Sequence, residues 1–314
     1  MTTSSDKTLS TLIKQKAFTL GFDLCGIAHS RPLIERENVL KEWCARGMNS
    51  EMGYLGKNIE KRINPESLVP GAKSVIVTGL NYYTDNKQEE PDVPIISRYA
   101  YGINYHDVIK KKLDLILELI RGLEAGAEGR AFADSEPFLE KAWAVEAGLG
   151  WQGRHSIVIN NKVGSFFFIG IIILNIELDY DRPWKENRCG SCRLCIDQCP
   201  TEAINENGTI DARKCIANLT IENRGPIPED IIPKIGKRVY GCDKCQEVCP
   251  WNKHAKPNIT PEFRLSEELK MMTGEEWINL SSGRFDRIFK KSPIERRRYE
   301  PFMRTVALVT KTQT

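Results

Sequence analysis

The stretch Cys189-Gly-Ser-Cys192-Arg-Leu-Cys195-Ile-Asp-Gln-Cys199-Pro200 decides the second half of the fold. Its C-x2-C-x2-C-x3-C-P spacing is typical of bacterial ferredoxins, in which three thiolates of one tight loop each hold one iron of a [4Fe-4S] cluster. The fourth iron needs a distant cysteine, because in two-cluster proteins the cysteine before the proline binds the other cluster. The run therefore predicts a ferredoxin-like module with two clusters.

A second run, Cys242-Asp-Lys-Cys245-Gln-Glu-Val-Cys249-Pro250, supplies the missing ligands. It has one cysteine fewer than the first run, and Cys215, 27 residues upstream of Cys242, can replace it. The spacing thus predicts one cluster held by Cys189, Cys192, Cys195 and Cys249, and another held by Cys199, Cys215, Cys242 and Cys245. The alternative is two zinc sites of four cysteines, although zinc sites usually show C-x2-C pairs rather than a triple run.

Composition sets the wider frame. The 314 residues are 41% hydrophobic and 28% charged, which excludes a disordered chain and a disulfide mini-scaffold and suggests about two domains. The net charge of +3 excludes a wholly basic surface. Eight of the ten cysteines are clustered, which favours metal binding over disulfides, and we interpret Cys25 and Cys44 as buried structural thiols.

Targeting signals are missing from the sequence. The longest apolar run, residues 166–174, is shorter than the ~20 residues of a membrane span. The start, Met-Thr-Thr-Ser-Ser-Asp, shows neither a basic segment nor an apolar one, so we expect no export and a cytoplasmic protein without a membrane partner.

The first region reads as mixed α and β structure. Apolar periodicity predicts helices over residues 7–20 and 106–123, and a helix from Pro137 to Gly148. Strands are expected at 74–80, at 129–134 and in two stretches, 155–159 and 165–175. A polar segment around Pro183 marks a boundary, so we expect a first domain at 1–181, the cluster module at 182–258 and a C-terminal helical segment with a basic stretch at 259–314.

The first domain must hold the chemistry, because two closed clusters move electrons but transform no substrate. It has no G-x-G-x-x-G opening a βαβ unit and no P-loop. The two cysteine runs resemble those of the epoxyqueuosine reductases. The chain resembles this family in four further stretches: Arg98-Tyr-Ala-Tyr-Gly-Ile-Asn-Tyr-His106, Phe132-Ala-Asp134-Ser-Glu-Pro, Ala147-Gly-Leu-Gly-Trp-Gln-Gly153 and Leu219-Thr-Ile-Glu222.

This resemblance implies an α+β fold: a nitroreductase-like α/β sandwich that binds cobalamin, followed by the ferredoxin-like module. It implies removal of the epoxide oxygen of epoxyqueuosine at the wobble position of tRNA, with an external reductant. Many members continue into C-terminal helical repeats, whereas this chain ends at Thr314, so we expect the short form. Nothing in the sequence requires more than a monomer.

The resemblance also implies site residues. Asp134 matches the proton donor of the family, and we expect burial to raise the pKa of its carboxyl group. Without the resemblance, the run Asp-Ser-Glu-Pro favours the alternative that Asp134 is a helix N-cap. His155 is expected at the rim of the corrin rather than as a cobalt ligand, because the D-x-H-x-x-G signature is missing. His106 is either a core or a substrate-pocket residue. The positions implied for cobalamin contact are Arg62, Ser97, Asp134, His155, Val158 and Ala217.

Binding of tRNA needs phosphate contacts from basic side chains. The candidates are Lys244, Arg296, Arg297 and Arg298, and the alternative is an ordinary solvated basic face. Two other functions stay open at this point: a cobalamin-dependent reductive dehalogenase that acts on a small molecule, and a non-catalytic electron carrier of the ferredoxin type.

Overall fold

The structure, a computed structural model, describes residues 8–311. Its first half is built on a four-stranded antiparallel sheet in the order β1 (Leu24–His29), β2 (Ser74–Asn81), β7 (Phe167–Leu174) and β4 (Gly129–Phe132). Every residue of β2 is buried, and β7 is nearly as buried, so the two central strands are covered on both faces. Their β-branched and aromatic side chains suit such a position.

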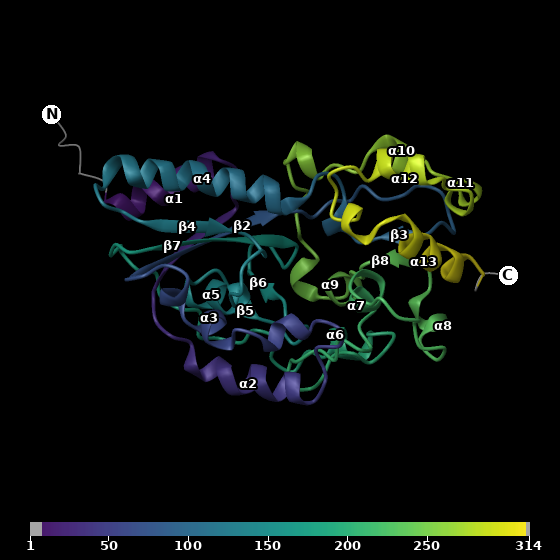
Figure 1. Ribbon diagram of the computed structural model, residues 1–314, viewed down its shortest axis with the longest axis horizontal. Coiled ribbons are helices and arrows are strands. Elements are labelled where there is room, and N and C mark those ends of the chain that lie inside the picture. The colour runs from purple at the N-terminus through teal and green to yellow at the C-terminus, as the bar shows by residue number, and fades with distance from the viewer. Residues whose placement is uncertain (1–7, 312–314) are drawn as a thin grey trace.

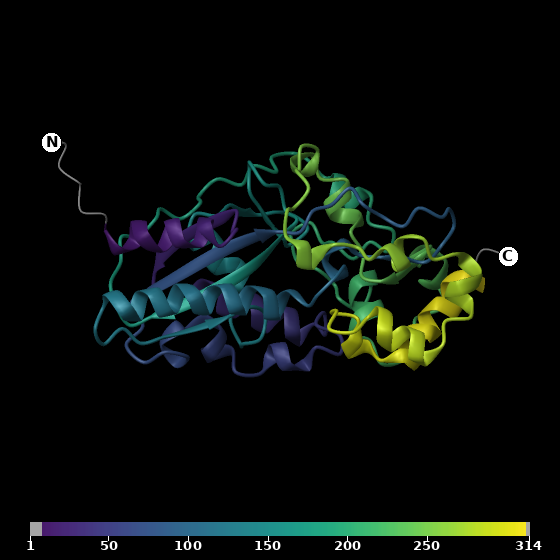
Figure 2. The same ribbon diagram turned by 90° about the horizontal axis from the view of Figure 1, so that it is seen from above.

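Helices cover both faces of this sheet (Figure 1). On one face lie α1 (Leu9–Thr19) and α4 (Tyr105–Leu123), which pack against each other across the strands (Figure 2). On the other face α5 (Glu140–Glu146) packs directly on the sheet, with α3 (Ile59–Ile63) and α2 (Ile34–Ala45) beyond it. The result is the α/β sandwich that the sequence led us to expect.

The cluster module is made of short elements between long loops. Its helices are α6 (Leu194–Asp197), α7 (Ile216–Ile221), α8 (Ile232–Ile235) and α9 (Lys244–Glu247), and its strand is β8 (Arg238–Tyr240). The C-terminal helices α10 (Glu267–Lys270), α11 (Gly274–Ile278), α12 (Ser282–Ile288) and α13 (Tyr299–Lys311) gather at the end of the molecule opposite α1 (Figures 1 and 2).

One segment of the first half belongs structurally to the second. The two-residue strand β3 (Ile95–Ile96) pairs in parallel with β8. Val93, Ile96 and Tyr101 share a core with Trp277 and Phe302 of the C-terminal helices. The chain therefore crosses between the two halves more than once, and the division at residues 181 and 258 stays a proposal.

The elements around Asp134 differ in detail from those expected. The strand before it is β4, as predicted, but α5 begins at Glu140 instead of near Pro137, and its N-cap residue is Leu139. The N-cap interpretation of Asp134 is therefore wrong. Residues 133–139 form an irregular loop in which Asp134 has a φ of 53°, in the left-handed region.

Other boundaries shift by a few residues. The strand predicted at 155–159 is shortened to β6 (Val158–Ile159), which pairs with β5 (Trp151–Gln152). The first helix begins at Leu9, and residue 7 of its predicted range lies outside the described residues. Within residues 8–311, none of the helices has the length and apolar character needed to cross a membrane.

Candidate functional site

A cavity of about 1240 Å³ lies between the sheet domain and the cluster module. Its walls come from α2, the start of α4, the loop that carries Asp134, the start of α5, the turn between β5 and β6, and α7. Both apolar and polar side chains line it. A cavity of this size and mixed lining fits a large organic ligand better than a small metabolite, because ordinary ligand pockets occupy roughly 300–1,000 Å³.

The first turn of α4 is fixed at the wall of this cavity. The side chain of Asn104 caps the helix by accepting a hydrogen bond from the backbone N–H of His106 at 3.2 Å. Tyr105 and His106 therefore follow directly on the cap and line the cavity. The structure thus supports the pocket interpretation of His106 over the core interpretation.

Asp134 meets these two side chains. The Tyr105 hydroxyl donates a hydrogen bond to Oδ2 of Asp134 at 2.7 Å, and Nε2 of His106 lies 3.6 Å from the same oxygen. The Asp134 side chain is 66% exposed, because it faces the open cavity. An acidic group, a phenol and an imidazole thus converge at one point of the cavity wall.

The electrostatics of this group differ from the expectation. Although the Asp134 side chain faces the open cavity, the protein walls around it partly desolvate its carboxyl group and raise the pKa, but the neighbouring His106 and Tyr105 lower it by more, so the pKa lies below its usual value. Burial and the charge of Asp134 hold the pKa of Tyr105 well above 10, so Tyr105 stays a donor. The predicted rise in the pKa of Asp134 is therefore wrong, because the protein side chains around Asp134 lower this pKa.

A second carboxyl group, which no sequence pattern indicates, lies beside Asp134. Oε1 of Glu140, the first residue of α5, accepts a hydrogen bond from the backbone N–H of Asp134 at 2.6 Å. Burial and the charge of Asp134 hold the pKa of Glu140 well above its ordinary value. Of the two carboxyl groups, Asp134 is thus the one that ionises first.

His155 is buried at another wall of the cavity. Its Nδ1 accepts a hydrogen bond from the backbone N–H of Ile157 at 3.2 Å, so the neutral ring carries its proton on Nε2. Burial, together with the charge of Lys141, lowers the pKa of His155 to about 4. His155 is therefore a neutral hydrogen-bond donor at neutral pH.

Several polar atoms on this wall have no partner in the protein. The buried Nε2 of His155, Nε1 of Trp151, Nε of Arg154 and both side-chain polar atoms of Asn218 make no hydrogen bond, and all four residues line the cavity. Buried polar groups are normally satisfied, so such a set calls for a ligand or ordered water. The amide groups on the rim of a corrin offer the donors and acceptors that these atoms need.

The predicted cobalamin contacts divide into two groups. Asp134, His155 and Ala217 line the large cavity. The other three do not line it among the described residues. Arg62 is buried and donates to the backbone carbonyls of Lys57 and Tyr54, and Ser97 contacts the carboxylate of Asp243. Val158 is buried in the core next to the cavity.

The eight clustered cysteines also divide into two groups. A separate cavity of about 240 Å³ is lined by Cys189, Cys192, Cys195 and Cys249. Its volume is several times the ~30 Å³ that one water occupies in the liquid, so it has room for a cluster rather than one ion. Burial raises the pKa of Cys249 to about 11, and the charges of Cys189, Cys195 and Cys192 add to this rise. The four thiols are therefore close neighbours.

The remaining four cysteines, Cys199, Cys215, Cys242 and Cys245, all line the large cavity. Burial raises the pKa of Cys245 well above its usual value, and the neighbouring Cys242, Cys215 and Cys199 add to this rise. This second group therefore adjoins the same space as Asp134, whereas the first group lines the separate, smaller cavity. Cys25 is separate from both groups, and burial raises the pKa of its thiol to about 12.

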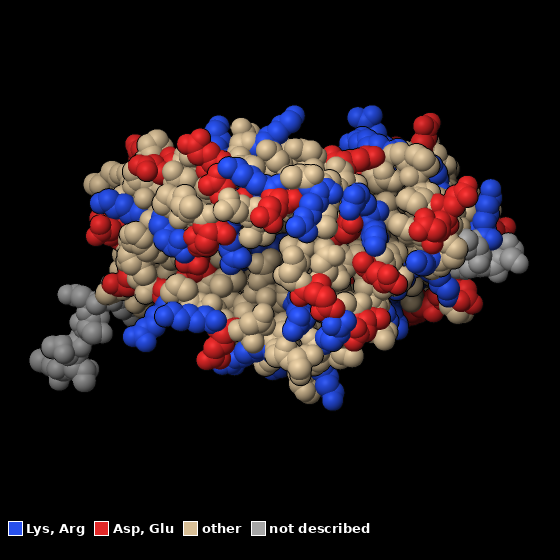
Figure 3. Space-filling model, turned by 90° about the horizontal axis from the view of Figure 1, so that it is seen from below, with Lys and Arg blue, Asp and Glu red and all other residues tan. Residues whose placement is uncertain are grey.

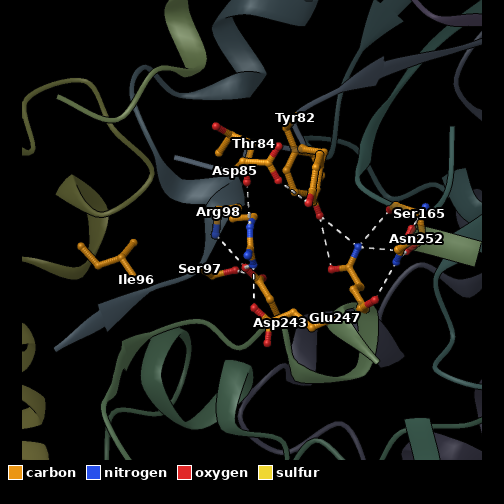
Figure 4. A network of polar contacts seen from close by, with 12 residues as sticks. Tyr82, Thr84, Asp85, Ile96, Ser97, Arg98, Ser165, Asp243, Glu247 and Asn252 are labelled. Carbon is orange, nitrogen blue, oxygen red and sulfur yellow. Dashed lines mark hydrogen bonds and ion pairs between the residues drawn. The ribbon is translucent and has the colours of Figure 1, made fainter. Parts of the chain in front are cut away.

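A buried polar network joins the sheet domain to α9, which carries Cys245 of the second group and ends two residues before Cys249 of the first (Figure 4). The backbone N–H of Ser165 donates to Asn252 at 2.7 Å, the Asn252 amide donates to the Ser165 hydroxyl at 2.9 Å, and Gln246 donates to the Ser165 carbonyl at 3.0 Å. Gln246 follows Cys245, and Asn252 lies three residues after Cys249. One serine thus anchors a ligand segment of each group.

The second part of the network surrounds Asp243. Its carboxylate accepts hydrogen bonds from the Ser97 hydroxyl and from the backbone N–H of Arg98 at 2.9 Å, and it pairs with the Arg98 guanidinium at 3.2 Å (Figure 4). Gly241 permits the close approach, because a Cβ there would lie 2.5 Å from the Cβ of Ser97. Ser97 therefore fixes the interface between the two halves.

The basic residues proposed for tRNA occupy different environments. Lys244 and Arg296 line the large cavity, and Arg296 is paired with Glu222. Arg298 is exposed. Arg297 is only 8% exposed and donates to the backbone carbonyls of Ile221 and Asn223, so its interpretation as a phosphate contact is wrong. On the face that carries α2, basic and acidic side chains are interspersed (Figure 3).

Comparison with known proteins adds independent findings. Residues 62–135 match the family described as epoxyqueuosine reductase QueG, DUF1730, and residues 188–252 match a 4Fe-4S double cluster binding domain. The chain is 42% identical to an epoxyqueuosine reductase of Cellulophaga algicola, over 95% of this chain and 96% of that one. It is 44% identical to one of Leadbetterella byssophila, over 95% and 97%.

Solved structures show the same likeness. The chain is 28% identical to an epoxyqueuosine reductase crystallised with an epoxyqueuosine-modified tRNA-Tyr stem loop (TM-score 0.88, 96% of this chain, 80% of that one). It is 27% identical to the Bacillus subtilis enzyme with its catalytic aspartate loop swung out of the active site (TM-score 0.87, 96% and 80%). A catabolic reductive dehalogenase, 16% identical, shares the fold alone (TM-score 0.50, 99% and 38%).

Proposed function

The chain belongs to the epoxyqueuosine reductases, and we propose that it removes the epoxide oxygen of epoxyqueuosine at the wobble position of tRNA to give queuosine. It is an oxidoreductase of queuosine biosynthesis that carries a double [4Fe-4S] cluster domain and uses cobalamin. We further propose that it works as a monomer in the cytoplasm, with an external reductant. The observation that carries this proposal is that Asp134 and one complete group of four cysteines line the same cavity.

The reaction fixes what the protein must provide. Converting the epoxide to an alkene consumes two electrons and two protons and releases the oxygen as water. When bound, cobalamin supplies the strongly reducing centre that this step requires, and the clusters supply electrons one at a time. The chain's own residues must hold these groups, exclude water and bring a proton to the departing oxygen.

Asp134 is the residue that we propose for proton delivery. Support comes from its place in the cavity wall and from the Tyr105 hydroxyl, whose hydrogen bond of 2.7 Å orients the carboxylate. A ligand that fills the cavity displaces water from Asp134, and desolvation raises the pKa of a carboxyl group. We therefore infer that Asp134 gains its proton when the cavity is filled and not before.

The cysteine groups support the assignment of cluster ligands. We propose that Cys189, Cys192, Cys195 and Cys249 hold one cluster and that Cys199, Cys215, Cys242 and Cys245 hold the other. Each group surrounds or borders one cavity, and neither needs a ligand from outside its own four cysteines. Since only the second group borders the cavity of Asp134, we propose that the cluster that these four cysteines would hold is the one that would supply electrons to that cavity.

The cavity wall supports a site for cobalamin. We propose that His155, Ala217 and Asn218 contact it there, with the Nε2–H of His155 donating to an amide on the rim of the corrin. The unpartnered polar atoms of His155 and Asn218 support this assignment. Arg62 and Ser97 instead stabilise the surrounding protein, because their polar groups are already engaged with other residues.

The tRNA side of the proposal rests on fewer residues. Lys244 and Arg296 line the cavity, and Arg298, two residues after Arg296, is exposed, so these three are the proposed phosphate or base contacts. Three other basic residues of the C-terminal segment, Lys270, Arg284 and Arg287, are paired with acidic side chains, so we do not assign them to tRNA.

The test is a turnover assay with defined tRNA. The anaerobically reconstituted protein, loaded with iron, sulfide and cobalamin, is given a chemical reductant and tRNA that contains epoxyqueuosine, and the nucleosides are analysed by mass spectrometry. We expect epoxyqueuosine to lose one oxygen and become queuosine. Loss of halide from a halophenol without change in the tRNA would instead favour a dehalogenase, and electron transfer without corrin binding would favour a carrier.

A further inference from the structure

The backbone of Asp134 is held in an unfavourable conformation. Its φ of 53° lies in the left-handed region, which non-glycine residues adopt rarely, although aspartate tolerates it better than most. It lies in the irregular loop 133–139, between the end of β4 and the start of α5. Such a conformation persists only where surrounding contacts hold it.

The contact that holds the backbone comes from Glu140. Its Oε1 accepts the hydrogen bond of the Asp134 backbone N–H at 2.6 Å. Glu140 is the first residue of α5, and the next turn of this helix buries Ala142, Trp143 and Ala144 against the sheet. The carboxyl group of Glu140 is therefore carried by a well-packed helix, whereas Asp134 and Ser135 at the tip of the loop are exposed.

The side chain of Asp134 has a different anchor. The Tyr105 hydroxyl reaches Oδ2 of Asp134 at 2.7 Å from the first turn of α4. Asp134 itself is thus held from two helices, by its backbone from α5 and by its side chain from α4. Release of the backbone contact would leave only the side-chain contacts with Tyr105 and His106 to keep Asp134 pointing into the cavity.

In the Bacillus subtilis relative, the catalytic aspartate loop has been seen swung out of the active site. A loop of this kind therefore has two positions in that protein. We propose that Glu140 is a positioning residue, whose carboxyl oxygen latches the backbone of Asp134 so that the loop stays in the position that presents Asp134 to the cavity. The inference rests on the proposed role of Asp134.

The protonation of Glu140 suits this task. Burial and the charge of Asp134 hold the pKa of Glu140 well above its ordinary value. A protonated carboxyl group keeps one oxygen as an acceptor, so the hydrogen bond to the Asp134 N–H survives without placing a second negative charge beside Asp134. Glutamine has nearly the same shape and also offers an acceptor oxygen, so it is a close substitute for the protonated side chain.

The first test measures the latch without any cofactor. Hydrogen–deuterium exchange is followed in peptides that contain the Asp134 amide, in the cofactor-free full chain. We expect Glu140→Ala to speed exchange of this amide by about tenfold, because its hydrogen bond is lost, and Glu140→Gln to stay close to wild type. Glu146→Ala is the matched control, since Glu146 lies on the same helix and pairs with Arg31 at 3.1 Å instead.

The second test uses turnover of epoxyqueuosine tRNA. Glu140→Ala should lower kcat by at least about tenfold with little change in KM, because misplacement of the proton donor affects the chemical step. Glu140→Gln should restore most of kcat, which a purely structural loss would not predict. Unchanged exchange in Glu140→Ala, or a Glu140→Gln variant as impaired as Glu140→Ala in both assays, would overturn the latch.

The two tests also separate the latch from the proposed function. If the wild-type protein leaves epoxyqueuosine unchanged, the proposed function fails, and the exchange data still decide whether Glu140 holds the loop. If the wild type turns over and Glu140→Ala matches it in kcat, the latch fails and the proposed function stands.

Discussion

The neutral state of His155 leads to a prediction about stability and pH. In the folded protein its pKa is about 4, mainly because the ring is buried, whereas the reference value is 6.5. Between these two values the unfolded chain binds a proton that the folded chain does not. The free energy of unfolding must therefore fall as the pH falls from about 6.5 to about 4. At ~1.36 kcal/mol for each pH unit, the full shift corresponds to about 3 kcal/mol.

The variant His155→Asn isolates this effect, because the asparagine oxygen can still accept the hydrogen bond that the Ile157 N–H gives to Nδ1. Urea denaturation of the cofactor-free protein at pH 7.5 and pH 4.5 gives the free energies of unfolding. Wild type should lose about 2–3 kcal/mol more than the variant over this interval. His254→Asn, at an exposed position, is the control. Equal losses in wild type and His155→Asn would refute a buried, neutral His155.

Three further predictions concern the site. Asp134→Asn should keep cobalamin binding but lower kcat by roughly 10²–10⁴-fold, as expected for removal of a general acid; turnover near that of wild type would refute proton delivery by Asp134. Cys192→Ala should lose about half of the bound iron while Cys25→Ala keeps all of it, and equal iron in both would break the ligand assignment. Asn252→Ala removes three buried hydrogen bonds to Ser165 and Gln246, so the free energy of unfolding, measured in urea, should fall by about 2–4 kcal/mol. Asn207→Ala, at an exposed position, is the control, and a fall no larger than that of the control would contradict the anchoring role of Asn252.

Local sequence patterns predicted the main elements of the sheet domain well. The apolar stripe of α4 and the β-branched run of β2 lie where their periodicity places them, because both elements bury a regular face. The start of α5 was misplaced, because Pro137 suits a first helical turn but here belongs to the loop that presents Asp134. The grouping of the cysteines around two cavities follows the spacing rule.

Contacts between distant segments were not predictable in this way. Glu140 resembles any acidic residue in a first helical turn, and its hydrogen bond to Asp134 depends on how the loop folds back. The pairing of β3 with β8 joins residues more than 140 positions apart, and two-residue strands leave no periodic signal. The expected rise in the pKa of Asp134 took only burial into account. The hydrogen bond from Tyr105 and the nearness of His106, which lower this pKa, are visible only in three dimensions.

The claim on which everything depends is that the two cysteine groups hold two [4Fe-4S] clusters beside the cavity of Asp134. The most direct measurement is the iron, sulfide and zinc content of the anaerobically purified protein, together with its electron paramagnetic resonance spectrum after reduction. The account predicts about eight irons and eight sulfides for each chain, with signals of two four-iron clusters. A colourless protein that contains zinc instead of iron would contradict it.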